Sequence, residues 1–478
     1  MDTLTLYRLS PALIPLAAAF LILLVEVFIK NTKHISFFVT LASVIAGLVL
    51  GISLFADLKG ITYSFGHSLY LSQVWIIVST LLLITTVFII LFSYKDKDLK
   101  GEYYFFILMA VSGMMGAAAS ANLLMIFLFI ELLSLCFYVM VTYNSRDVRA
   151  NEGALKYFIL GAFAAGFFVL GIALIYATTG SLMLPELTLF IEAQHESLPI
   201  TLYIGISSLI VALGFKAAAV PFHMWTPDAY EAAPIQVTGF MATAVKITSF
   251  SVLFSVFMLF LSPIHKIWLP IMYGLALLTM TLGNLAAIVQ DSLKRLLAYS
   301  AIAHAGYVLI TFVVFNHSLP EHEAVIALFF YLIVYSFMNL GAFAVLTVIK
   351  QDDIKAFQGL GFKYPYLAFA LTVFLLSLAG IPPTAGFLAK FYIFAAAVKT
   401  DFYWLALFGV INAFIGIYYY TKIVVAMYMK ESSSSLDIKQ DKLMTGLIAI
   451  LIVLVFYLGI HPEETLNLIQ KAVLGLFG

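Results

Sequence analysis

Several side chains that can take up or release a proton occur inside apolar stretches of this 478-residue sequence. The set comprises Glu131, Lys156, Lys216, His223, Lys246, His304 and Lys390. Burial in apolar surroundings disfavours the charged form of a lysine, and a nearby carboxylate favours it again. A lysine whose acid partner can approach or withdraw therefore switches between holding and releasing a proton. Several such groups, joined by water and by a histidine that titrates near neutral pH, make a proton relay.

Four of these side chains also have a purely structural interpretation. Glu131 can be neutralised by a lysine that only holds two helices together. Lys156 lies near the end of its apolar stretch, so it can extend to the membrane interface. His304 can be a neutral, hydrogen-bonded core residue, and His223 fits either interpretation.

Lys246 and Lys390 have longer apolar stretches on both sides. Extension to the interface suits them poorly, and ionisable groups inside a bilayer are rare and usually functional. Proton transfer is therefore the favoured role for both. Lys422, near the end of its apolar stretch, is expected to be an interfacial anchor.

The stretch Leu213–Pro234, LGFKAAAVPFHMWTPDAYEAAP, must position Lys216 and His223. Pro221 removes a backbone donor and clashes with the preceding turn, so a helix that contains Lys216 is expected to break here. A broken helix at membrane depth is tolerated only where protein or a water-filled cavity covers the freed backbone groups. A lysine beside such a break is expected to have a functional role.

Composition assigns the chain to the all-α polytopic membrane proteins. It is 63% hydrophobic and only 10% charged, with 25 basic and 25 acidic residues. The balanced charge gives no attraction to nucleic acid, and the single cysteine, Cys136, excludes a disulfide framework or a cysteine-based metal site. No nucleotide-binding motif is present. The energy for any transport must therefore come from an ion gradient or a partner.

Apolar runs of roughly 20 residues predict about fourteen spanning segments. They are expected near residues 12–29, 35–56, 72–93, 103–120, 122–143, 154–178, 201–219 with a continuation to 232, 235–259, 267–290, 297–316, 324–349, 366–399 with an interruption, 402–428 and 443–460. The tail after Pro462 is amphipathic at helical spacing, which favours a helix on the membrane surface.

Loop charges predict the orientation. Basic residues concentrate in odd-numbered loops, as at Lys95, Lys294 and Lys355, which places these loops in the cytoplasm by the positive-inside rule. The seventh loop is the exception, because its charges are the acids Asp228 and Glu231. Both termini are then expected on the non-cytoplasmic side, in a bacterial inner membrane.

A second interruption, SLAGIPPTAGFLAKF, contains Pro382, Pro383 and Lys390. Five segments separate the two interruptions, so segments 4–8 and 9–13 are predicted to form inverted five-helix repeats, a pattern of transporters with a site near the midplane. The expected division is an N-terminal three-helix part at 1–100, the first repeat at 101–260, the inverted repeat at 261–430, and a final helix with the amphipathic tail at 431–478.

Four stretches together resemble the antiporter-like subunits of proton-pumping NADH:quinone oxidoreductase, respiratory complex I, and within that family the subunit N type. They are GALKYFILGAFAAGFFVLG, GFKAAAVPFHMWTPDAYEAAP, QDSLKRLLAYSAIAHAGY and LSLAGIPPTAGFLAKFYIF. The resemblance implies that Glu131 and Lys216 are an interacting acid–base pair. It further implies that Lys246 and His304 are the connecting relay and that Lys390 is the terminal proton-exchanging group.

The resemblance also implies a proton-conducting module of a redox-driven pump. The complex would use NADH, FMN, iron–sulfur clusters and a quinone in other subunits, while this chain would bind no cofactor. Its partners would be further membrane-arm subunits, including antiporter-like ones, a peripheral redox arm and the lipid bilayer.

Three other functions remain open at this level. The chain could be a subunit of a multi-subunit cation/proton antiporter or of a hydrogenase- or ferredoxin-linked complex, since both use the same helix break. It could also be a structural membrane spacer whose charges only fix helix packing. If the chain is a spacer, replacing the lysines should weaken assembly of the complex. The number of protons pumped per electron should then stay unchanged in whatever complex assembles.

Overall fold

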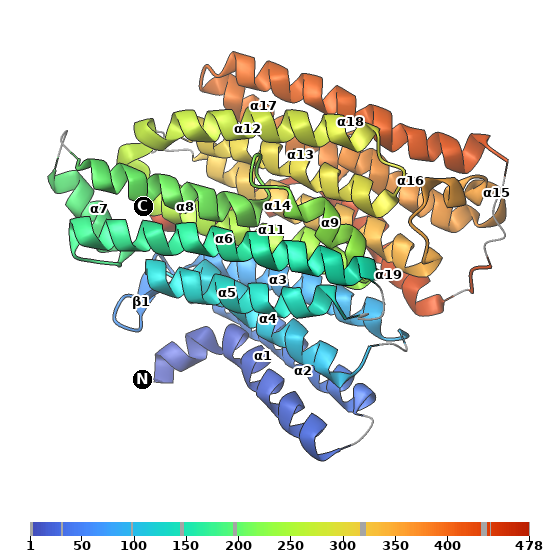
Figure 1. Cartoon of the computed structure of the whole chain (residues 1–478), viewed down its shortest axis with the longest axis horizontal. Helices are drawn as coiled ribbons and strands as arrows, with labels where there is room; N and C mark the ends of the chain where they lie inside the picture. The colour runs from blue at the N-terminus through green and yellow to red at the C-terminus, as the bar shows by residue number, and fades with distance from the viewer. Residues whose placement is uncertain are drawn as a thin grey trace. The chain divides into compact units, whose positions relative to one another are not determined.

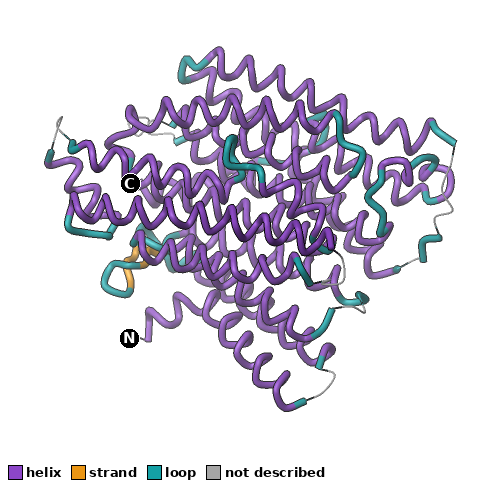
Figure 2. Tube along the Cα trace, in the orientation of Figure 1, coloured by secondary structure: helices purple, strands orange, loops and turns teal. Residues whose placement is uncertain are grey.

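The chain is described by a computed structural model over residues 3–29, 32–96, 99–143, 148–194, 198–315, 322–431, 437–439 and 441–477. Within these residues it is built of helices joined by short loops, with one small antiparallel hairpin (Figure 2). The hairpin pairs Thr62–Ser64 with Leu69–Leu71. The expected all-α membrane architecture is confirmed.

Thirteen described helices are long and apolar enough to cross a membrane. They match every predicted segment except the one at 366–399. That segment consists of two shorter helices, α16 (Pro365–Ala379) and α17 (Ala385–Lys399), on either side of the expected interruption. The division of the chain into two inverted repeats stays a prediction.

The described elements divide into two compact units. Unit 1 comprises residues 1–217, 244–269 and 470–478. Its elements are α1 (Thr3–Phe28), α2 (Lys33–Leu54), β1 (Thr62–Ser64), β2 (Leu69–Leu71), α3 (Gln73–Ser93), α4 (Gly101–Ala119), α5 (Leu123–Val141), α6 (Val148–Thr179), α7 (Leu184–Ala193), α8 (Ile200–Ala217), α11 (Lys246–Leu253), the π-helix η2 (Phe254–Phe260) and the short 3-10 helix η3 (Ser262–Ile264). Figure 1 shows α5, α6 and α8 running side by side, and α5 and α8 carry Glu131 and Lys216.

Unit 2 comprises residues 218–243 and 270–469. Its elements are α9 (Trp225–Ala232), α10 (Ile235–Phe240), most of α12 (His265–Ile288), α13 (Leu293–Val314), α14 (Glu323–Ile349), η4 (Ile354–Phe357), α15 (Leu360–Lys363), α16, α17, α18 (Tyr403–Met429), α19 (Lys442–Ile460) and the first part of α20 (Glu463–Phe477). The π-helical turn η1 (Met241–Val245) joins α10 to α11. The tail after Pro462 forms α20, so its helical pattern is confirmed.

Side-chain caps fix where two helices of the site begin. The Asn122 side chain accepts hydrogen bonds from the backbone N–H groups of Leu124 and Met125, which starts α5. The Ser292 hydroxyl accepts from the N–H of Arg295, which starts α13. These oxygens satisfy N–H groups that have no partner inside the helix. The two caps therefore fix the residues at which α5 and α13 begin.

Both interruptions lie where the sequence predicts them. Helix α8 ends at Ala217, and Ala218 adopts a left-handed φ of 56° before Pro221. Helix α16 ends before Gly380, whose φ is 87°, and the two prolines that follow cannot continue it. Glycine adopts a positive φ without the steric cost that other residues meet. Each broken helix therefore leaves terminal carbonyl groups without helical N–H partners.

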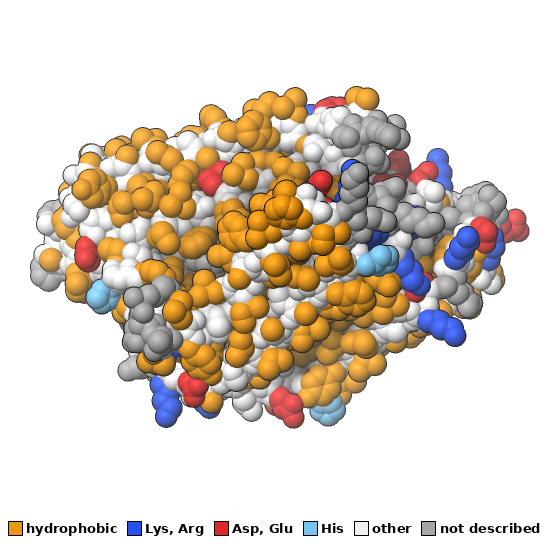
Figure 3. Space-filling model, turned by 90° about the horizontal axis from the view of Figure 1, so that it is seen from below, with side chains coloured by type: hydrophobic (Ala, Val, Ile, Leu, Met, Phe, Trp, Pro, Cys, Tyr) orange, Lys and Arg blue, Asp and Glu red, His pale blue; other side chains and the backbone are white. Residues whose placement is uncertain are grey.

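Apolar side chains cover much of the outer surface. Figure 3 shows hydrophobic side chains over most of the visible face, with few charged ones among them. Large exposed examples are Phe163, Phe414 and Val453, each in a helix long enough to span a membrane. A surface of this kind fits a lipid environment, because water-soluble proteins rarely expose large contiguous apolar patches.

Candidate functional site

The first site of unit 1 is the Glu131–Lys216 pair. Lys216 lies in the last turn of α8 with only 5% of its surface exposed. Its Nζ atom is 3.9 Å from Glu131 Oε1 and donates a hydrogen bond of 2.6 Å to Ser134 Oγ. Glu131 and Ser134 stand three residues apart on α5 and so share one face of that helix. The acid and the base are close enough to attract each other, with the serine hydroxyl as the direct partner of the ammonium group.

Lys246 is bound to the interrupted end of α8. It is 3% exposed and follows directly on the π-helical turn η1. Its Nζ atom donates 2.6 Å to the carbonyl of Ala217, and Ser249 Oγ on the next turn donates 3.0 Å to the carbonyl of Lys216. Terminal helix carbonyls carry partial negative charge, so they stabilise a buried ammonium group. The structure thus brings Glu131, Lys216 and Lys246 together in one unit.

Lys390 has the same kind of partner at the second interruption, in unit 2. It is 5% exposed, and its Nζ atom donates 2.9 Å to the carbonyl of Leu378 and 2.8 Å to that of Ala379. Both carbonyls belong to the last residues of α16. Nζ also lies over the ring of Tyr307, 5.0 Å from its centre. The interruption therefore supplies the oxygen ligands of this lysine.

Close approach of α16 and α17 requires small residues. A Cβ atom built on Gly386 would lie 1.8 Å from the carbonyl oxygen of Ser377. One built on Gly380 would lie 3.0 Å from Cδ of Lys390. These glycines let the two half-helices pack closely enough for Lys390 to reach the end of α16.

His304, on α13 in unit 2, is buried among hydroxyl groups. Its Nδ1 atom is 2.6 Å from Tyr331 OH, and its Nε2 atom is 3.4 Å from Tyr420 OH. Tyr420 OH is also hydrogen-bonded to Ser300 Oγ. Two ring nitrogens that both have hydroxyl partners allow a neutral imidazole to accept a proton on one side and donate on the other.

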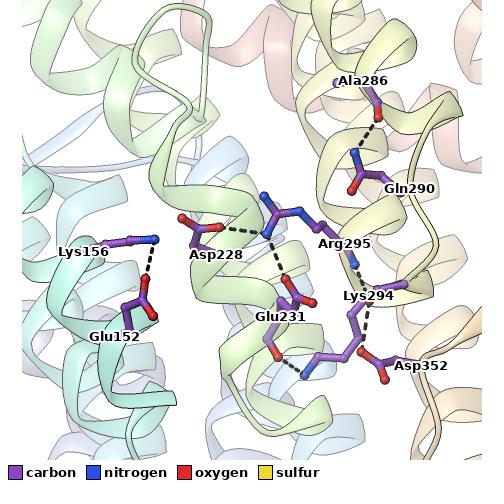
Figure 4. Close-up of polar contacts among 10 residues, drawn as sticks. Glu152, Lys156, Asp228, Glu231, Ala286, Gln290, Lys294, Arg295 and Asp352 are labelled. Atoms are coloured by element: carbon purple, nitrogen blue, oxygen red, sulfur yellow. Dashed lines mark hydrogen bonds and ion pairs between the residues drawn. The ribbon is translucent and has the colours of Figure 1, made fainter. Parts of the chain in front are cut away.

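The other two sequence candidates have different surroundings. Lys156 lies on α6 with 48% of its side chain exposed, and its Nζ atom is 2.8 Å from Glu152 Oε1 one turn away (Figure 4). His223 is partly buried in the turn before α9, where its carbonyl accepts from the N–H of Thr226. A role in proton transfer stays a prediction for both.

A charged cluster that the sequence reasoning missed fixes α9 in unit 2. Arg295 Nη1 lies 2.8 Å from Asp228 Oδ1 and 2.8 Å from Glu231 Oε2 (Figure 4). Lys294 Nζ donates to the carbonyls of Glu231 and Ala233 at 2.5 and 2.7 Å. Asp228 and Glu231 are the acids that interrupt the loop-charge pattern. Their local counter-charge, Arg295, is distant in sequence.

Three further site residues were also missed. Ser134 could have been found, because it stands three residues after Glu131 and so shares its helix face. Ser249 and Tyr307 could not be found in this way, since the contacts that place them in the site, with Lys216 and with Lys390, are made to other helices. Among the described residues, no group of three or more His, Cys, Asp or Glu side chains could hold a metal ion.

Comparison with known proteins finds the NADH:quinone oxidoreductase/Mrp antiporter transmembrane family, whose model matches residues 120–416. Subunit N 2 of the NADH-quinone oxidoreductase of Solibacter usitatus is 40% identical over 86% of this chain and 84% of that protein. Subunit N 1 from Chloroherpeton thalassium is 36% identical over 98% of each chain.

Solved structures show the same fold. A chain of respiratory complex I from Thermus thermophilus aligns with a TM-score of 0.83 and 30% identity, over 97% of this chain and 100% of that one. A chain of the Mrp complex from Dietzia sp. aligns with a TM-score of 0.88 over 100% of this chain and 98% of that one. The identity in that second alignment is 18%, so it shows a shared fold alone.

Proposed function

The chain belongs to the subunit N family of NADH-quinone oxidoreductase, and we propose that its buried lysines carry protons across the membrane. It is an integral, multi-pass, proton-translocating membrane subunit of that oxidoreductase. The electrons pass from NADH to a quinone, as the names of its relatives state. The task of this chain is therefore to couple proton movement to a redox reaction of the whole complex.

The observation that carries the proposed residue roles is the environment of Lys216. A fully buried lysine is 3.9 Å from a carboxylate, at the interrupted end of a membrane helix. Desolvation favours release of its proton, whereas the field of Glu131 favours retention. A small movement of Glu131 relative to Lys216 changes the balance and so converts a conformational signal into proton release.

Each unit holds its own relay in this proposal. In unit 1 the proton moves between Lys216 in the last turn of α8, whose Nζ donates to Ser134 of α5, and Lys246, whose Nζ donates to the carbonyl of Ala217 at the end of α8. In unit 2 His304 receives and passes the proton among hydroxyl groups, and Lys390 is the terminal exchanging group. All four groups can hold or release a proton, which a relay requires.

We also propose a finer assignment, which membership of the family and the charges of the loops support. The redox groups, FMN and iron–sulfur clusters, lie in other subunits, and this chain binds no cofactor. Its partners are further membrane-arm subunits and a peripheral redox arm. The membrane is the bacterial inner membrane, with both chain termini on the non-cytoplasmic side. The antiporter alternative is supported by the matching family model, whose description also names the Mrp antiporter, and by the shared fold of the Mrp complex chain.

The test uses the assembled complex, isolated in mild detergent and returned to vesicles, with Lys216→Ala in this chain. We expect flavin and iron–sulfur subunits to co-purify and quinone reduction to persist, while protons pumped per electron fall. Lys422→Ala removes an exposed lysine of α18 and should leave the ratio unchanged.

Two outcomes contradict the proposal. An unchanged pumping ratio in assembled Lys216→Ala complex favours the structural spacer. Co-purification with polytopic membrane chains alone, without NADH:quinone activity, favours the cation/proton antiporter.

A further inference from the structure

Lys390 lacks the acid partner that Lys216 has. In the part of the chain that the structure describes, no carboxylate lies within 4.0 Å of its Nζ atom, and its contacts are two carbonyl oxygens and the ring of Tyr307. A buried ammonium group without compensation carries a large desolvation cost. The two carbonyl oxygens and the ring of Tyr307 must therefore offset the desolvation cost of the Lys390 ammonium group.

The helices around Lys390 contain almost no acids. Helices α13, α14, α16, α18 and α19 pack against α17. Their only acidic residue is Glu323, the first residue of α14, which is paired with Lys399. In α20, the exposed Glu463 interacts with Tyr392 of α17. The remaining titratable groups buried on the three helices α13, α14 and α18 are Lys294, which donates to the carbonyls of Glu231 and Ala233, and His304, Tyr307, Tyr331, Tyr335, Tyr419 and Tyr420.

The ring of Tyr307 is held in place by its packing against neighbouring rings, and its hydroxyl group adds a hydrogen bond. Asn284 Nδ2 donates 2.9 Å to Tyr307 OH, and Tyr419 OH donates 3.1 Å to Asn284 Oδ1. Tyr307 is 1% exposed, and its ring contacts those of His304 and Phe394 edge to face. The face of the ring is thus fixed beneath the ammonium group of Lys390.

We propose that Tyr307 is a positioning residue whose ring face serves as the counter-charge that keeps Lys390 protonated between transfers. The negative face of an aromatic ring attracts a cation, and the attraction is strongest where water is excluded. This inference rests on the proposed role of Lys390 as the terminal exchanging group. Tyr307 acts through Lys390 and does not itself transfer the proton.

The test is the pH profile of protons pumped per electron by the assembled complex in vesicles. Tyr307→Leu removes the ring and leaves the protonated form of Lys390 less stable. Lys390 then loses its proton at lower pH, so the alkaline fall in pumping should move down by about one pH unit. Tyr307→Phe loses the hydrogen bond from Asn284 but keeps the ring face and its packing against His304 and Phe394, so it should keep the wild-type profile.

Matched variants separate this effect from lost packing. Phe312→Leu removes a buried ring elsewhere on α13 and should leave the profile in place. If the leucine variant fails to assemble, Tyr307→Met removes the π face while retaining a flexible apolar filler. The methionine variant should show the same downward shift.

The outcomes distinguish this inference from the function on which it rests. A wild-type profile in Tyr307→Leu or Tyr307→Met overturns the inference, as does a Tyr307→Phe profile shifted as far as that of leucine. Normal pumping in assembled Lys390→Ala complex overturns the role of Lys390, and the inference with it.

Discussion

Individual residues solve the problem of burying a lysine in two different ways. Lys216 has an acid nearby, whereas Lys246 and Lys390 are bound to the carbonyl groups at the ends of interrupted helices. A carboxylate is a full charge that can move, while terminal carbonyls are fixed partial charges. Lys216 is therefore the residue at which movement of a single side chain can change proton affinity most.

The hydroxyl of Ser134 is the direct hydrogen-bond partner of Lys216. Its removal in Ser134→Ala should destabilise the charged lysine by about 1.5–3 kcal/mol, since hydrogen bonds to charged groups are worth that much. We expect the proton-binding constant of Lys216 to fall about tenfold or more and pumping per electron to decrease, with quinone reduction retained. Proton-to-electron ratios in vesicles measure this.

Ser208→Ala is the matched control for that variant. Ser208 is also buried and lies on α8, but its hydroxyl donates to the carbonyl of Ile204 within the same helix. Its loss should leave the pumping ratio at the wild-type value. Equal decreases in both variants would contradict a specific role for Ser134.

At the level of elements, the interruptions create the binding groups for the lysines. An intact helix would satisfy the carbonyls of Ala217, Leu378 and Ala379 with its own N–H groups. Because α8 and α16 end there, these oxygens are available to Lys246 and Lys390. The segment after the first interruption, α9, is in turn held by Arg295 through Asp228 and Glu231.

The second interruption depends on close backbone contact at Gly386. In Gly386→Ala the added Cβ would meet the carbonyl oxygen of Ser377, so the half-helices must move apart. Overpacking of this kind destabilises by about 1–3 kcal/mol. We expect a lower unfolding temperature and less assembled complex in the membrane.

Gly446→Ala provides the comparison, because nothing lies within 4 Å of a Cβ built at that position of α19. This change should be neutral or slightly stabilising, since alanine favours helix more than glycine does. If Gly386→Ala unfolds at the same temperature as Gly446→Ala, the half-helices do not need their close contact.

At the scale of the whole molecule, the number of spanning segments decides which loops face the cytoplasm. The thirteen long apolar helices and the interrupted pair α16–α17 match the segments used for the loop-charge argument. Asp228 and Glu231 are acids in a loop where that pattern predicts basic residues. Because both are paired with Arg295, they do not count against the predicted orientation. We therefore expect the predicted alternation of loops to hold along the chain.

Single-cysteine labelling tests this orientation. Cys136 is the one native cysteine and is buried, so Cys136→Ser gives a background without thiols. Lys355→Cys and Lys59→Cys place exposed thiols in loops predicted to lie on opposite sides. A membrane-impermeant thiol reagent added outside intact cells should label position 59 and spare position 355. The reverse pattern would contradict the predicted orientation.

The sequence by itself determined the class of protein, the segments and the positions of both interruptions. Hydrophobicity over a segment's length and the backbone limits of proline are local properties, so they can be read from the chain. The same holds for the choice of Lys216, Lys246 and Lys390 as buried charges, because each stands far inside an apolar run.

Only the tertiary structure decided what each charge binds. The pairing of Lys390 with Tyr307, of Lys246 with Ala217 and of Arg295 with Asp228 joins residues distant in sequence. It also placed Lys156 on an exposed helix face beside Glu152. Such contacts depend on how helices rotate and pack. In a uniformly apolar helix little in the sequence distinguishes one face from another, since residues on all sides are hydrophobic.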